Sequence, residues 1–149
     1  MPTRPHKTPR GRSRLGKPFA AATGLILGFS ILAGASAAKP ALGSVNEITD
    51  GLIDIAIAYE ISEVCGPIDA RLLRGISALN GLKSQASALG YTDEEIEAFV
   101  RDRGEKARLE ALARERLAAL GATRGDEESH CAVGRQQMAE GTAIGRLLR

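Results

Sequence analysis

Residues 44–65 read SVNEITDGLIDIAIAYEISEVC, and their apolar pattern decides the fold class. A first stripe at steps of three and four residues consists of Val45, Ile48, Leu52, Ile55 and Tyr59. A second stripe consists of Ile53, Ile57, Ile61 and Val64. This spacing predicts an α-helix from about residue 45 to 64, and two apolar faces indicate a helix at the centre of a core. Ser44 and Glu47 match a capping box at its start.

Two further helical regions follow this central one. A helix is expected from about residue 69 to 89, ending before Gly90. Its inward stripe is expected to consist of Ile68, Leu72, Ile76, Leu79, Leu82, Ala86 and Leu89. Thr92 and Glu95 then match a second capping box. The apolar stripe changes direction near Gly104, which predicts a short helix followed by a longer one.

The C-terminal region predicts one more helix and an ordered tail. Asp126 is expected to cap a helix that runs to about Glu140, and residues 142–149 are expected to pack Ile144 and Leu147 on the bundle. No segment alternates apolar and polar residues with a period of two. The sequence therefore predicts an all-α fold, a small bundle of four to five helices.

The first 37 residues have the order of a secretory signal peptide. Residues 1–17 carry six basic and no acidic side chains, residues 19–35 are uncharged, and residues 35–38 read ASAA. We expect cleavage after Ala37 or Ala38, which leaves a single helical domain over residues 38–149 in the periplasm or outside the cell. The alternative is an uncleaved membrane anchor over residues 19–37, although a bilayer core needs about 20 mostly apolar residues.

Charge and composition exclude several classes of function. The chain has 149 residues and a net charge of +2, but the six basic residues of the leader leave 14 basic against 18 acidic side chains. Aromatic residues make up 3% of the chain, and Trp is absent. The length excludes a large enzyme. Nucleic acid is not an expected partner because the remaining domain is acidic and poor in aromatic residues.

The two cysteines are expected to form a disulfide. Cys65 ends the first predicted helix, and Cys131 lies near the start of the last one. Neighbouring thiols become disulfides in an oxidising compartment. In the chain-entropy model, a disulfide that closes a loop of this length stabilises the folded state by about 4 kcal/mol. A pair of buried or reactive thiols is the alternative, and it fits a cytoplasmic protein better.

No catalytic, cofactor or metal site is predicted. His130 is the only histidine of the expected domain, and we expect it to be exposed, since it points about 100° away from its neighbour Cys131. The sequence lacks C-x-x-C and H-E-x-x-H motifs. Acidic residues 93–97 are explained by a helix start, because carboxylates there favour the positive end of the helix dipole.

Several segments of the expected domain resemble a known family. They are Lys39-Pro40, residues 47–52, residues 55–58, Cys65, residues 78–84, residues 89–96, residues 105–108, Cys131 and residues 141–149. Their combination resembles a family of small exported bacterial proteins defined as a domain of unknown function (family 5333). The resemblance covers nearly the whole expected domain and carries over no catalytic residue.

Two functions remain as hypotheses. The first is a non-enzymatic periplasmic module that binds an envelope protein, and that touches the membrane only through an uncleaved leader. Its candidate docking surfaces are the arginine-rich face of residues 101–116 and the tail from Arg146 to Arg149. The alternative is an enzyme or small-ligand carrier with a pocket in the bundle. The polar residues nearest to the apolar stripes, which such a pocket would use, are Tyr59, Glu60, Glu63, Asn80 and Lys83.

Overall fold

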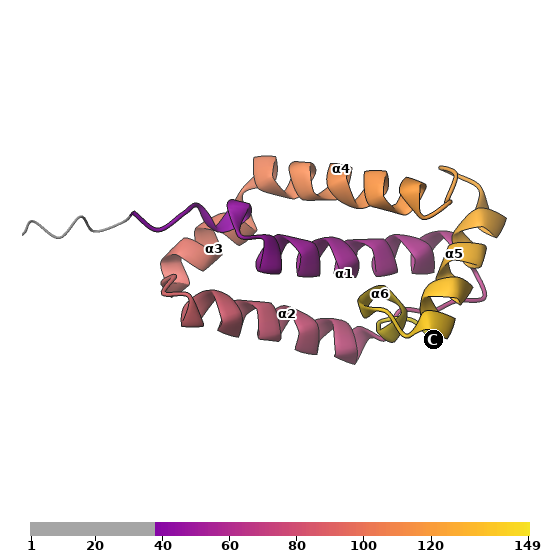
Figure 1. The fold of residues 1–149 in the computed structure, drawn as a ribbon, viewed down its shortest axis with the longest axis horizontal. Helices are drawn as coiled ribbons and strands as arrows, with labels where there is room; N and C mark the ends of the chain where they lie inside the picture. Colours follow the sequence, from indigo (N-terminus) through magenta and orange to yellow (C-terminus); the bar gives the residue numbers. More distant parts are fainter. Residues whose placement is uncertain (1–37) are drawn as a thin grey trace, which may run out of the picture. The chain divides into compact units, whose positions relative to one another are not determined.

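A computed structural model describes residues 38–149, and this part of the chain is all-α, as predicted (Figure 1). The predicted leader, residues 1–37, lies outside the described residues. The elements are the 3-10 turn η1 (Leu42–Ser44) and the helices α1 (Asn46–Val64), α2 (Leu72–Ala88), α3 (Asp93–Arg101), α4 (Arg103–Ala119), α5 (Glu127–Glu140) and α6 (Ala143–Arg146). Within residues 38–149, no helix is both long and apolar enough to cross a bilayer.

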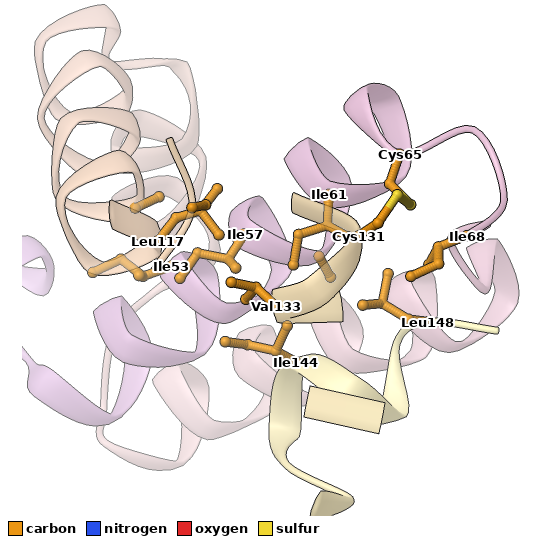
Figure 2. Packing of buried hydrophobic residues seen from close by; sticks show 13 residues of the cluster. Ile53, Ile57, Ile61, Cys65, Ile68, Leu117, Cys131, Val133, Ile144 and Leu148 are labelled. Carbon is orange, nitrogen blue, oxygen red and sulfur yellow. A yellow bond between two sulfur atoms is a disulfide. The ribbon is translucent and has the colours of Figure 1, made fainter. Parts of the chain in front are cut away.

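Helix α1 is the centre of the bundle, as its two apolar stripes predict. It lies between α4 and α2, and α5 and α6 pack against its C-terminal half (Figure 1). Ile57 and Ile61 are fully buried. Figure 2 shows how they meet side chains from α4, α5 and the C-terminal segment. A second, smaller cluster of buried residues consists of Leu42, Ile48, Ala86, Tyr91 and Ile96.

One predicted capping box is confirmed, and the other is wrong. At α3 the Glu95 N–H donates to the Thr92 hydroxyl (3.2 Å), while the Glu95 carboxylate accepts from the Thr92 N–H (2.7 Å). At α1 the Ser44 hydroxyl instead donates to the Ala41 carbonyl (2.7 Å) and closes η1. Helix α1 therefore begins without a side-chain cap.

The predicted break between the short and the long helix is confirmed, but a cap produces it. Asp102 ends α3, and its carboxylate accepts from the N–H groups of Gly104 (2.7 Å) and Glu105 (3.0 Å). This is the N-cap arrangement that satisfies the free donors at a helix start. Helix α4 therefore begins as a separately capped helix.

The C-terminal tail is ordered and changes where α2 begins. The main chains of Asp69 and Arg149 exchange two hydrogen bonds of 2.9 Å, and the Arg71 N–H donates to the Leu147 carbonyl (2.7 Å). Because these main-chain groups bind the tail, α2 begins at Leu72 rather than at residue 69. Ile144 is buried as predicted, whereas Leu148 and not Leu147 is the fully buried leucine of the tail.

The disulfide between Cys65 and Cys131 is confirmed. The two Cα atoms are 5.1 Å apart, and both residues are buried (Figure 2). The bond joins the C-terminal end of α1 to the first turns of α5. The free-thiol alternative is therefore contradicted.

The expectation that His130 is exposed is wrong. Its side chain is 2% exposed. The Nδ1 atom lies 2.8 Å from the Asp126 carbonyl, and Nε2 lies 4.0 Å from the Glu60 carboxylate of α1. The cap at Asp126 sets the first turn of α5 so that position 130 faces α1. His130 is thus part of the packing between α1 and α5.

Candidate interaction surface

The outer side of α2 is apolar and exposed. Leu72 is 73% exposed, Leu73 82%, Ile76 55% and Leu79 45%. The sequence pattern predicts that most of this stripe faces the core, and that expectation is wrong. Of the predicted inward residues only Ile68 and Ala86 are buried.

Helix α2 is fixed to the bundle at its two ends. At its C-terminal half, Leu82 packs so closely on Gly51 of α1 that a Cβ placed there would come within 2.6 Å of the leucine. At its N-terminus, the residues before Leu72 pair with the tail. Because these contacts set the rotation of α2 about its axis, Leu72, Ile76 and Leu79 lie at its flank beside α1 and stay partly exposed, whereas Leu73 faces solvent.

Two apolar hollows lie beside this stripe, between α2 and the helices next to it. One has a volume of about 270 Å³, and its apolar lining is Leu52, Ala56, Leu79, Phe99, Val100 and Leu109. The other has a volume of about 190 Å³, and its apolar lining includes Ile55, Tyr59, Leu72, Ile76 and Leu79. They share Leu79 and together form a groove along α1 and α2, in which α3 and α4 wall only the larger hollow and Leu147 of the tail borders the smaller one. We call this groove and the exposed stripe of α2 the open face.

The open face carries no charge at its centre. Helix α2 has no charged residue from Gly75 to Leu82, and its only charged side chains are Arg74 and Lys83. Charges of both signs lie at the rim on α4, where Lys106 and Glu110 are 3.9 Å apart. A ligand on this face would therefore meet apolar side chains first and charges only at the edge.

The residues proposed for a small-ligand pocket do not come together. Lys83 pairs with Asp93 of α3 (3.3 Å), Glu60 faces His130, and Tyr59 lies 58% exposed on the open face. Glu63 and Asn80 are exposed to solvent on different helices. No group of three His, Cys, Asp or Glu side chains suited to a metal ion occurs among residues 38–149.

A cleft between α1, α2 and α6 has more polar walls, but the charged side chains that line it already form hydrogen bonds within the chain. The cleft has a volume of about 370 Å³ and is lined in part by Asp54, Arg74, Ser77 and Arg146. Asp54 accepts a hydrogen bond from Arg116 (3.3 Å). Arg74 donates to the Arg146 carbonyl and Arg146 to the Gly141 carbonyl. These contacts fix the C-terminal segment.

The groups with shifted pKa values also serve packing. Burial raises the pKa of Asp54, against the opposing effect of the neighbouring Arg116. The hydrogen bond to Asp50 (2.6 Å) raises the pKa of Arg116, so this guanidinium stays charged and joins α4 to α1. A hydrogen bond from Lys39 lowers the pKa of Glu95 and holds the residues before η1 against α3.

The arginines proposed as docking surfaces are partly used inside the bundle. Arg108 donates to the Gly43 carbonyl (2.7 Å), and Arg116 binds two aspartates of α1. In the tail, the Arg149 guanidinium lies 3.7 Å from Asp69. The sequence shows the apolar residues of the open face, but a stripe facing the core and a stripe facing a partner have the same helical spacing.

Comparison with known proteins identifies a family and no activity. No curated protein and no solved structure matches the chain. A family model matches residues 40–149, which include every helix described above. The match begins shortly after the predicted leader, at residue 40, and it includes both cysteines and all the residues of the open face. The chain therefore belongs to DUF5333, a family of unknown function.

Proposed function

We propose that this protein is a non-enzymatic binding module outside the cytosol, and that its open face docks an apolar, uncharged α-helix. The observation that carries the proposal is the exposed stripe of α2, from Leu72 to Leu79. Soluble monomers rarely expose contiguous apolar patches larger than a few hundred Å², and larger patches mark interaction sites. Val100 of α3, which is 70% exposed, extends this patch across the groove.

The shape of the groove favours a helix as the ligand. Its floor and walls are themselves helices, and an amphipathic helix can lay its apolar side chains into such a groove at positions i, i+3, i+4 and i+7. The apolar centre favours an occupant whose buried stripe is uncharged, because burying an unpaired charge there costs several kcal/mol, on the order of 3–5. The rim charges of α4 are left at the edge, where water still reaches them.

A location outside the cytosol is supported by two independent features. The first 37 residues have the order of a signal peptide. The disulfide between Cys65 and Cys131 is compatible with an oxidising compartment, where such bonds persist. Mass spectrometry of the protein from an envelope fraction tests this part of the proposal. We expect a chain that begins at residue 38 or 39; an intact leader would favour the anchored alternative, and a cytosolic chain with free thiols would contradict export.

Photo-crosslinking in living cells tests the docking function. Val100 is replaced by a photoreactive phenylalanine derivative in the full chain, and Ala111, which is exposed on the outer side of α4, is replaced in a matched control. We expect a crosslinked adduct from position 100 and none from position 111. The adduct from position 100 should disappear when Ile76→Glu is added, because this substitution places a charge in the groove.

Equal adducts from both positions would contradict a specific docking face. The absence of any adduct, together with a measured turnover by the purified protein, would favour the enzyme alternative. Of the five polar residues suggested for that alternative, only Tyr59 lines one of the hollows described above.

A further inference from the structure

We propose that the cleft between α1, α2 and α6 binds a small aliphatic carboxylate, with its charged end at Arg74 and Arg146 and its apolar chain along the cleft walls. The cleft has a volume of about 370 Å³. Sites for small ligands usually have volumes of about 300–1,000 Å³. This inference goes beyond the helix docking proposed above and does not depend on it. The two sites are neighbours, because Ile55 and Leu147 line both the cleft and the smaller hollow of the open face.

The two arginines of the cleft use few of their hydrogen-bond donors within the chain. A guanidinium has five N–H donors and keeps its positive charge in proteins. Arg74 donates to the Arg146 carbonyl (3.2 Å), and Arg146 donates to the Gly141 carbonyl (2.8 Å). Within residues 38–149, neither guanidinium forms an ion pair, whereas Arg116 binds two aspartates of α1. The described part of the chain therefore supplies no counter-ion to Arg74 or Arg146.

Contacts between distant parts of the chain hold the two arginines at one cleft. The bond from Arg74 to the Arg146 carbonyl joins α2 to α6. Just before α2, the Arg71 N–H donates to the Leu147 carbonyl (2.7 Å). Helix α6 itself begins at a cap, in which the Thr142 hydroxyl accepts from the Gly145 N–H (3.0 Å). A site that is fixed before the ligand arrives loses less conformational freedom on binding.

The lining of the cleft favours a ligand with one negative charge and an apolar body. Apart from Asp54, Ser77 and the two arginines, it consists of Gly51, Ile55, Ala78, Leu82, Ala143 and Leu147. Such walls cover a short hydrocarbon chain and remove it from water. A carboxylate can accept two parallel hydrogen bonds from one guanidinium.

Asp54 limits the charge that the cleft can accept. Burial raises the pKa of this carboxyl, and the charges of Arg116 and, more weakly, of Arg146 oppose the effect. The charge of Arg146 therefore reaches the lining of the cleft. A doubly charged anion would be repelled by the Asp54 carboxylate more strongly than a single carboxylate, and a small one would leave the apolar walls uncovered.

Titration followed by NMR tests the inference. Isotope-labelled protein is purified from the envelope of cells that express the full chain, and sodium hexanoate is added. We expect saturable shifts of the Ser77, Ala78 and Ala143 amide signals, with a dissociation constant of about 1 mM or tighter. Hexanol has the same chain and no charge, and it should bind at least about 10-fold more weakly. Sodium acetate lacks the apolar chain and should also bind at least about 10-fold more weakly.

Three variants locate the site. Arg74→Gln and Arg146→Gln each remove one guanidinium and should raise the dissociation constant of hexanoate by about 10-fold or more. Ala143→Phe removes no charge but should prevent binding, because a larger side chain at this position occupies the cleft. Ala143 is exposed, so the fold should tolerate this change. Arg114→Gln is the matched control and should leave the dissociation constant unchanged, since Arg114 is exposed on α4 and does not line the cleft.

Thermal unfolding checks the fold of each variant, and if one arginine variant does not fold, the other one and Ala143→Phe decide. The absence of saturable shifts at about 10 mM hexanoate would overturn the inference. Hexanol that binds as tightly as hexanoate would do the same, as would an Arg114→Gln variant that binds as weakly as Arg74→Gln. Shifts confined to Leu72, Ile76 and Leu79 would place the ligand on the open face and would overturn the cleft as its site. The helix docking is tested separately, by the crosslink at position 100.

Discussion

Helices α2 and α4 each have 17 residues and flank α1 on different sides, yet their outer faces differ in chemistry. Helix α4 carries eight charged residues, and Leu112, at 37%, is its only large apolar side chain in the exposed class. Helix α2 carries two charged residues. Four of its large apolar side chains, and Leu89 at its C-cap, are each at least 45% exposed. The inner side of α4 is buried at Ala113 and Leu117, whereas α2 buries only Ala86.

The two helices therefore present different surfaces to water. Helix α4 has an apolar stripe toward α1 and charged residues on its other faces. This is the ordinary pattern of a surface helix that packs on one side and is solvated on the other. Helix α2 turns part of its stripe outward, where the hydrophobic effect favours a further contact. The proposed docking of a helix on the open face follows from this difference.

Truncating the inner side of α4 has the largest expected effect. Leu117 is 2% exposed and packs near Ile53 and Ile57 (Figure 2). Leu117→Ala should lower the free energy of unfolding by about 2–5 kcal/mol, because it removes buried methyl groups and leaves a cavity. Leu73→Ala is the matched change on α2, and it should shift the unfolding of the monomer by less than about 0.5 kcal/mol. Urea unfolding at low protein concentration measures both. Equal losses would mean that Leu73 is packed within one chain.

The separate cap of α4 gives a smaller effect. Asp102 accepts from two N–H groups at the start of α4, whereas α2 has no side-chain cap and relies on the tail. Asp102→Ala should cost about 1 kcal/mol, within a usual range of 0.5–2 for an N-cap. Urea unfolding measures the loss, and Asp102→Asn is the control that should retain most of the stability. An unchanged Asp102→Ala variant would mean that tertiary packing alone sets the start of α4.

A glycine on α2 offers a change in the opposite direction. Nothing lies within 4 Å of the position that a Cβ of Gly81 would take. Gly81→Ala should therefore stabilise the monomer by roughly 0.5–1 kcal/mol, since alanine restricts the unfolded chain and favours the helix. Gly145→Ala is the contrasting control, because its Cβ would overlap the Gln137 carbonyl. Thermal unfolding measures both, and a destabilised Gly81→Ala variant would show that α2 is strained or packed at this position.

The sequence predicted the centre of the fold better than its outer surface. The apolar stripes of α1 are long, and both pack against other helices of the same chain. Ile57 and Ile61 could therefore be placed in the core from the sequence. The stripe of α2 was visible too, but its rotation depends on the tail pairing with Asp69 and Arg71, about 80 residues away. Local patterns do not contain such contacts. For the same reason, the turn η1 that uses the Ser44 hydroxyl and the burial of His130 against α1 were not predicted.

The smallest expected effect is the pH dependence of stability that Asp54 produces, the residue of α1 that binds Arg116 of α4. The sign of this effect distinguishes the cost of burying Asp54 from the attraction of Arg116. Burial raises the pKa of Asp54 above its ordinary value of 3.8, so the folded state holds this proton more tightly than the unfolded chain. Ionising Asp54 therefore costs the wild type stability as the pH rises through the range just above 3.8. Asp54→Asn does not titrate. The difference in unfolding free energy should shift in favour of the variant across that range and stay constant above it.

Urea unfolding of the wild type and of Asp54→Asn at several pH values measures this difference. Asp50→Asn is the control on the same helix face, because Asp50 also binds Arg116 but is more exposed. A shift in favour of the wild type would mean that the attraction of Arg116 outweighs burial at Asp54. In that case α4 would owe part of its attachment to the ion pair, and the contrast with α2 would lie in the inner contacts of the two helices as well as in their outer faces.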